Sequence, residues 1–194
     1  DRDDVGLARR IGADPCYRRM FAAAFPGAPN DLGFARVTAA LAAFQRTMIS
    51  FGSAHDRGTL SPLAQRGARQ FAAAGCGSCH SGPDFTDSKT HYVGTAAPQE
   101  VDAAAYGGKP LPPGFEPPPE QFRTPSLRNV AVTGPWLHDG QSPTIESAIR
   151  RHAAPMLVDV DMPALLAFLD ALTDHDFLKN AALGRPAASC PIPA

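Results

Sequence analysis

The sequence lacks the marks of several protein classes. No run of roughly 18 or more apolar residues could span a membrane. The 18 basic and 19 acidic side chains leave a net charge of −1, so no basic field indicates a nucleic-acid partner. Alternating strand patterns are scarce, and the opening residues DRDDVGLARR are too charged for a secretory signal. These absences favour a helical protein with a core, since 44% of the 194 residues are hydrophobic.

Cysteine is also scarce. Four cysteines are too few for a disulfide scaffold. Cys76 and Cys79 form a local pair, whereas Cys16 and Cys190 lie far apart in the sequence. The local pair therefore has to be explained by chemistry of its own.

What is present is mainly helical. Asp14 followed by Pro15 begins one helix, and Ser61–Pro62 and Ser142–Pro143 begin two more. Apolar residues recur at helical spacing in the remaining segments, with the 34–50 stripe at Phe34, Val37, Leu41, Phe44 and Met48, and the 163–172 stripe at Leu165, Phe168, Leu169 and Leu172. The proline-rich residues 93–123 are predicted to be loop. We expect a mainly α fold with long loops rich in proline and glycine.

Residues 76–80 read CGSCH, which is the attachment signature of c-type haem. The two thiols add to the two vinyl groups of one haem, and His80 then supplies the proximal nitrogen to iron. A zinc site would want a second pair of ligands at short spacing, and no second C-x-x-C exists. A redox dithiol or disulfide would be expected to open a helix, whereas this motif follows one that ends near Gly75. Haem c is attached outside the cytoplasm, so the sequence predicts an exported, periplasmic bacterial protein.

A second informative segment is residues 122–152, which read FRTPSLRNVAVTGPWLHDGQSPTIESAIRRH. It closely resembles the C-terminal haem domain of bacterial dihaem cytochrome c peroxidases and their MauG-type relatives. Residues 60–95 are similar to the same family around its second haem. ADPCYRRMFAAAFPG and ALAAFQRTMISFGSAHDRG are similar to the segment between its two haem motifs.

The resemblance implies a domain plan. Residues 1–56 would be a helical segment flanking a first haem domain absent from this chain. Residues 57–175 would form a class I cytochrome c-like haem domain, and residues 176–194 a tail that packs back on the first segment. Family members carry two C-x-x-C-H motifs and this chain has one, so the resemblance implies that the peroxide-handling residues lie outside it.

The resemblance also implies the axial ligands of the iron. His80 is proximal by adjacency. In the family the distal ligand lies fourteen residues after the histidine of the H-[DN]-G run, here His138, and that count gives His152. The helical pattern agrees, because His152 falls on the apolar face of its helix. Met156 and Met162 are alternative ligands, and a histidine bonded to backbone is the plain structural alternative.

Other roles carry over residue by residue. Arg128 matches a position from which a guanidinium could pair with a haem propionate; a solvated arginine is the alternative. Thr133 and Pro135 match positions whose backbone carbonyls bind a calcium ion, against a plain turn. His91 and His138 match haem-neighbouring positions and are interpreted as structural. The family's tail folds back on the first domain, which favours a Cys16–Cys190 disulfide.

Three functions follow as hypotheses. The first is the electron-transfer haem c domain of a peroxidase-type oxidoreductase that uses hydrogen peroxide. Its partners would be the first haem domain, or a separate chain carrying it, and a small redox protein as electron donor or a protein substrate. The second is a single-haem periplasmic cytochrome c carrier without catalytic activity, although residues 14–25 and 34–50 exceed what a minimal carrier needs. The third is a binding or structural domain in which CGSCH is incidental.

Overall fold

The computed structural model describes residues 4–92, 121–153, 157 and 159–184. The chain forms two compact units, one of residues up to 49 together with those from 177, and one of residues 50–176. The predicted division after residues 56 and 175 stays a prediction.

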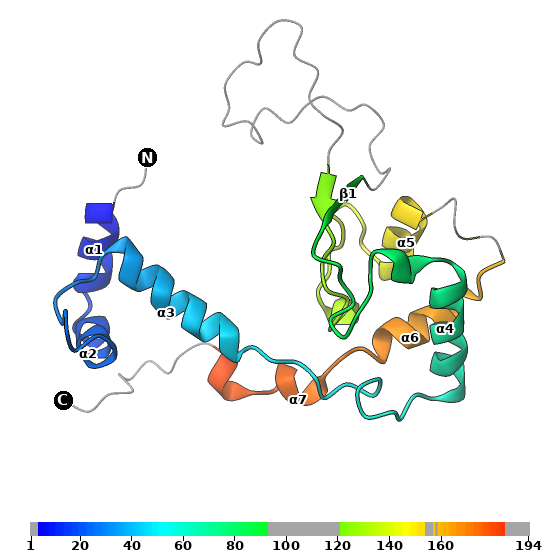
Figure 1. Cartoon of the computed structure of the whole chain (residues 1–194), viewed down its shortest axis with the longest axis horizontal. Helices are drawn as coiled ribbons and strands as arrows, with labels where there is room; N and C mark the ends of the chain where they lie inside the picture. Colours follow the sequence, from blue (N-terminus) through cyan, green and yellow to red (C-terminus); the bar gives the residue numbers. More distant parts are fainter. Residues whose placement is uncertain (1–3, 93–120, 154–156, 158, 185–194) are drawn as a thin grey trace, which may run out of the picture. The chain divides into compact units, whose positions relative to one another are not determined.

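The described residues are mainly helical, as predicted (Figure 1). No helix among them is long and apolar enough to cross a membrane. The elements in chain order are α1 (Asp4–Gly12), α2 (Pro15–Ala24), α3 (Phe34–Thr47), α4 (Pro62–Ala73), the 3₁₀ helix η1 (Cys76–Ser78), β1 (Thr90–Tyr92), β2 (Gln121–Arg123), the 3₁₀ helix η3 (Val130–Val132), α5 (Ile145–Ala153), α6 (Met162–Asp170), α7 (His175–Leu178) and the 3₁₀ helix η5 (Ala181–Leu183).

Side-chain caps begin several of these helices where the sequence predicted. The Asp14 carboxylate accepts a hydrogen bond from the Cys16 amide at 2.7 Å, and the Ser61 hydroxyl accepts one from Ala64 N at 3.2 Å. α5 begins later than predicted, at Ile145, because the Thr144 hydroxyl rather than Ser142 accepts from the Ser147 amide at 3.1 Å.

Two elements differ from the prediction. Residues 121–123, expected to be loop, form β2, which pairs antiparallel with β1 in the register His91 opposite Phe122. Strands of three residues are too short to show an alternating pattern, so their pairing could not be read from the sequence. α1 was not predicted. The rest of the expected loop, 93–120, lies outside the described residues.

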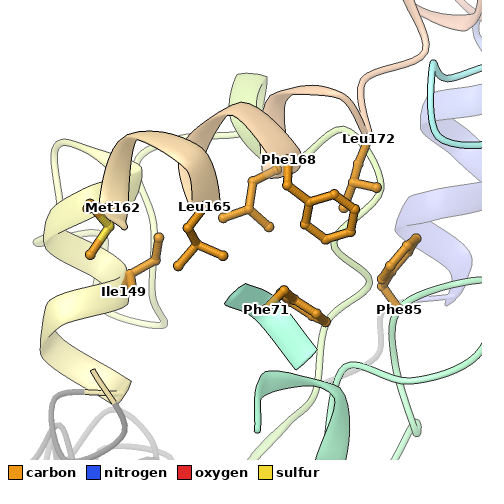
Figure 2. Packing of buried hydrophobic residues seen from close by; sticks show 8 residues of the cluster. Phe71, Phe85, Ile149, Met162, Leu165, Phe168 and Leu172 are labelled. Atoms are coloured by element: carbon orange, nitrogen blue, oxygen red, sulfur yellow. The ribbon is translucent and has the colours of Figure 1, made fainter. Parts of the chain in front are cut away.

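The core of the 50–176 unit lies between α4, α5 and α6. Figure 2 shows Leu165 and Phe168 of α6 directed toward Ile149 of α5 and Phe71 of α4. The ring centroids of Phe71 and Phe168 are 5.3 Å apart, within the range of favourable aromatic pairs. The predicted inward stripe over 163–172 is confirmed, since its members, three in α6 and one just after it, are at most 5% exposed: Leu165, Phe168, Leu169 and Leu172.

α4 and α6 approach closely at Gly67. A Cβ built on Gly67 would lie 1.8 Å from the Ala164 carbonyl oxygen and 2.8 Å from the Phe168 Cβ. Only a residue without a side chain fits there, so the glycine fixes how near the two helices come.

In the other unit, α3 forms as predicted, but its apolar stripe is not covered. Leu41 is 56% exposed, and Phe34, Phe44 and Met48 are 44%, 39% and 42% exposed. Exposed apolar side chains that gather on one helix face often mark an interface.

Because no side chain fits between α4 and α6 at Gly67, Gly67→Ala should destabilise the 50–176 unit. The added methyl must push backbone against backbone, and overpacking of this kind costs roughly 1–3 kcal/mol. The urea unfolding midpoint of the holoprotein measures the change. Gly27→Ala is the matched control, because nothing lies within 4 Å of a Cβ at Gly27. An equal, small effect of both substitutions would contradict the close approach.

Candidate haem site

A cavity of about 600 Å³ opens in the 50–176 unit, a volume in the range of cofactor sites. Its walls come from η1, the two strands, the segment around η3, and the helices α5 and α6. They are mostly apolar and include Phe71, Leu127, Val130, Ile149, Leu165 and Leu169.

The CGSCH turn supplies one wall. Gly75, with φ 74°, takes the left-handed conformation that ends α4 and turns the chain into η1. His80 N then donates to the Cys76 carbonyl at 3.0 Å. This tight turn places Cys76, Cys79 and His80 together on the cavity wall, with both thiols free.

Two histidines face one cavity from different elements. His80 comes from the turn after η1, and His152 comes from the last turn of α5. Their ring centroids are 6.5 Å apart and their ring planes make an angle of 79°. A metal–imidazole nitrogen distance of about 2 Å would place the centroids of two coaxial imidazoles roughly 6 Å apart. The spacing therefore fits one metal ion held between the two rings.

The second nitrogen of each ring is bonded to backbone. His80 Nδ1 lies 3.1 Å from the Phe85 carbonyl oxygen, and His152 Nδ1 lies 2.9 Å from the Ala148 carbonyl oxygen. A carbonyl partner makes Nδ1 the protonated nitrogen and leaves Nε2 with its lone pair. This is the arrangement typical of metal-ligating histidines.

Burial in this wall lowers the pKa of His80, and the neighbouring His152 lowers it further, against hydrogen bonds that raise it. A neutral imidazole is the form that binds metal. Burial also raises the pKa of the Cys76 thiol. A redox dithiol needs a lowered thiol pKa, so this environment does not favour that alternative.

Zinc is not favoured either. Among the residues that the structure describes, no group of three or more His, Cys, Asp or Glu side chains could hold an ion. Two thiols, two opposed imidazoles and apolar walls instead fit a covalently attached haem c.

An ion pair fixes α5 to the preceding turn. Arg151, next to His152, lies 2.9 Å from Asp139 and donates to the Ser142 hydroxyl at 3.3 Å. The Arg151 guanidinium and the Gln141 amide lower the pKa of Asp139 to about 2. This contact holds the His152 helix against the turn that carries His138.

Aromatic rings form the wall near that turn. His138 stacks on Phe122, with centroids 3.9 Å apart and planes 15° apart. Trp136 donates from Nε1 to the Val130 carbonyl at 2.8 Å. Thr133 and Pro135 line the same cavity, and their role as calcium ligands stays a prediction.

Arg128 does not line the cavity. Its guanidinium donates to both Asp56 carboxylate oxygens at 2.9 Å and to the Ser50 carbonyl at 2.8 Å. It also lies 3.8 Å from the centroid of the Phe51 ring. The side chain, 9% exposed, thus holds the 50–56 loop, and its pairing with a haem propionate stays a prediction.

Met162 and Cys16, named in the alternative ligand set and the expected disulfide, are both among the described residues. Met162 lies in the hydrophobic core and does not line the cavity, whereas Met156 lies outside the described residues. Cys16 is disulfide-bonded. Cys190 lies outside the described residues, so its pairing with Cys16 stays a prediction.

The contact between His91 and Asp87 was not predicted from the sequence. His91, interpreted as structural, lines the cavity, and its Nε2 lies 2.7 Å from Asp87 Oδ2. Four residues separate the two in a non-helical segment, where such spacing does not predict contact. The only available signal was the resemblance, which placed His91 near the haem loop.

Several known proteins are similar to this chain. The sequence model of the family described as di-haem cytochrome c peroxidase matches residues 2–61. The methylamine utilization protein MauG of Methylorubrum extorquens is 38% identical over 74% of this chain and 41% of its own length. The cytochrome c551 peroxidase of Nitrosomonas europaea is 30% identical over 86% of this chain and 52% of its own length.

A solved structure is similar to this chain in fold. The crystal structure of a MauG-like protein associated with microbial copper homeostasis superposes with a TM-score of 0.72 and 29% identity, covering 96% of this chain and 66% of that one. The fold of this chain, with a cavity that fits haem c, is thus similar to that of haem proteins of this family. The chain is a relative of the bacterial dihaem cytochrome c peroxidases and MauG proteins, and it spans about half the length of these two relatives.

His152→Met should raise the midpoint potential of the haem while keeping it low-spin, because Met/His ligation favours ferrous iron. We expect a shift on the order of 0.1 V, within the roughly 0.8 V that axial ligands span. A spectroelectrochemical titration measures it. His175→Met, on the exposed His175, is the control. An unchanged potential and spectrum in His152→Met would show that His152 is not a ligand.

Arg128→Leu should destabilise the protein by about 3 kcal/mol, because it leaves the largely buried Asp56 carboxylate without its charged partner. Denaturant unfolding of the holoprotein measures the loss. Arg150→Leu is the control: the Arg150–Glu146 pair is exposed and worth at most about 1 kcal/mol. If Arg128 has only the structural role, the haem potential stays unchanged in Arg128→Leu. A shifted potential with little loss of stability would instead support pairing of Arg128 with a haem propionate.

Proposed function

We propose that this chain is the electron-transfer haem c domain of a dihaem cytochrome c peroxidase or MauG-like oxidoreductase that uses hydrogen peroxide. One observation carries the proposal: His80 and His152 both line one cavity, and their ring centroids are 6.5 Å apart. An iron held by both imidazoles has no open position for peroxide. Such a site suits electron transfer rather than substrate binding.

When bound, haem supplies one-electron chemistry. The residues of this chain anchor, orient and shield it. Cys76 and Cys79 would hold the macrocycle covalently, and the Phe85 and Ala148 carbonyls orient the two axial rings. The apolar walls would shield the rim of the haem, and two imidazole ligands would keep the potential below that of a Met/His site.

The peroxide-binding haem would then lie outside this chain. The relatives are about twice as long, and the chain carries one C-x-x-C-H motif. The exposed apolar face of α3, with Leu41 and Phe44, would pack against the first haem domain or a separate chain carrying it. This face also favours an enzyme half over the alternative, a single-haem carrier, which would leave it in water.

Finer assignments belong to the same proposal. Residues 57–175 would be a class I cytochrome c-like domain, in which α4 and α6 cross at Gly67 and the haem motif follows α4. Thr133 and Pro135 would offer carbonyl oxygens to calcium. The protein would work in the periplasm, with a small redox protein as electron donor or a protein as substrate.

Native mass spectrometry of the protein isolated from its producing bacterium tests the proposal. We expect two covalent haems per particle, on this polypeptide extended or joined by a second one. Hydrogen peroxide should oxidise a reduced donor protein only in such two-haem particles. A single haem on a lone chain of this size would support the carrier instead. Peroxide turnover by such a one-haem chain would place the chemistry at this haem and overturn the electron-transfer role.

A further inference from the structure

An imidazole hydrogen-bonded to a carboxylate lies in the cavity wall, apart from His80 and His152. His91 on β1 lines the cavity, and its Nε2 is 2.7 Å from Asp87 Oδ2. The Asp87 side chain is 13% exposed and that of His91 is 34% exposed. The pair is therefore at the mouth of the cavity rather than in the core.

Asp87 is fixed to the haem-anchoring turn. Its backbone amide donates to the Cys79 carbonyl at 2.8 Å, and its carboxylate accepts from the Lys89 amide at 3.0 Å. The Lys89 amide foremost, and His91 as well, lower the pKa of Asp87 to about 2. An ionised carboxylate thus holds the His91 ring at a set distance from the turn.

The strand register directs His91 toward the cavity. His91 is opposite Phe122 in the β1–β2 pair, so both side chains are on the same face of the sheet. Phe122 stacks on His138, and all three line the cavity. With Nε2 engaged by Asp87, Nδ1 is the ring nitrogen available to a group inside.

A bound haem would offer His91 Nδ1 one kind of polar partner, its propionates. Its two faces would be taken by His80 and His152, so other wall residues meet its rim, which is apolar except for two propionates. Arg128, the residue predicted to meet a propionate, is engaged by Asp56. Arg123 also lines the cavity, but it is an exposed residue of β2.

We propose that His91, oriented by Asp87, donates a hydrogen bond from Nδ1 to a haem propionate. This inference rests on the haem of the proposed function. Donation from both ring nitrogens requires the imidazolium form, whose charge would lie between the Asp87 carboxylate and the propionate. A positive charge near the haem rim favours ferrous iron, so His91 would raise the midpoint potential.

His91→Gln and His91→Leu test the proposal in the holoprotein. Haem content and the low-spin spectrum should stay unchanged. The propionate bending band in the resonance Raman spectrum should shift, and the midpoint potential should fall, more in His91→Leu than in His91→Gln. Asp87→Asn should shift the same Raman band by less, because it loosens the ring without removing it.

Two controls separate other causes. Thr90→Val alters an exposed neighbour on the same strand, so strand disturbance alone would move both readouts in that variant too. Arg123→Gln tests the other cationic wall residue. If Arg123→Gln shifts the propionate band and both His91 variants leave it unchanged, the proposal is overturned. A wild-type protein without covalent haem would instead refute the proposed function.

Discussion

The close approach of α4 to α6 at Gly67 is the constraint on which the rest of the 50–176 unit depends. Because no side chain separates the helices there, α6 packs Leu165 and Leu169 beneath the cavity while α4 ends beside it. The Gly75 turn then delivers the two cysteines to the wall. A wider helix crossing would move the thiols away from the floor that the haem needs.

Local chemistry explains why the sequence points to His80 and His152 as axial ligands, an assignment that stays a prediction. CGSCH is a local signature of haem c attachment and points to His80. His152 follows from helical periodicity together with the family spacing from His138. Arg128 shows where such reasoning ends. Its partners Ser50 and Asp56 are more than 70 residues away, and only the folded loops bring them together. His91 is the converse case, because strands too short for an alternating pattern direct it into the cavity.

The two units of the chain differ in how well they cover their own apolar surface. The 50–176 unit buries Phe71, Phe168 and Leu172 in a continuous cluster. The α3 stripe was predicted as the apolar face of a helix, yet Leu41 is 56% and Phe34 is 44% exposed. Periodicity identifies which face of a helix is apolar but not which chain segment covers it. On our account that cover is the first haem domain.

Near-infrared magnetic circular dichroism of the ferric holoprotein tests the central claim, that His80 and His152 are both ligands of one iron. The energy of the low-spin charge-transfer band depends on the axial pair. The account predicts the band of bis-imidazole ligation for the haem bound to Cys76 and Cys79. A band at the energy of imidazole–thioether ligation, or only high-spin features, would contradict it.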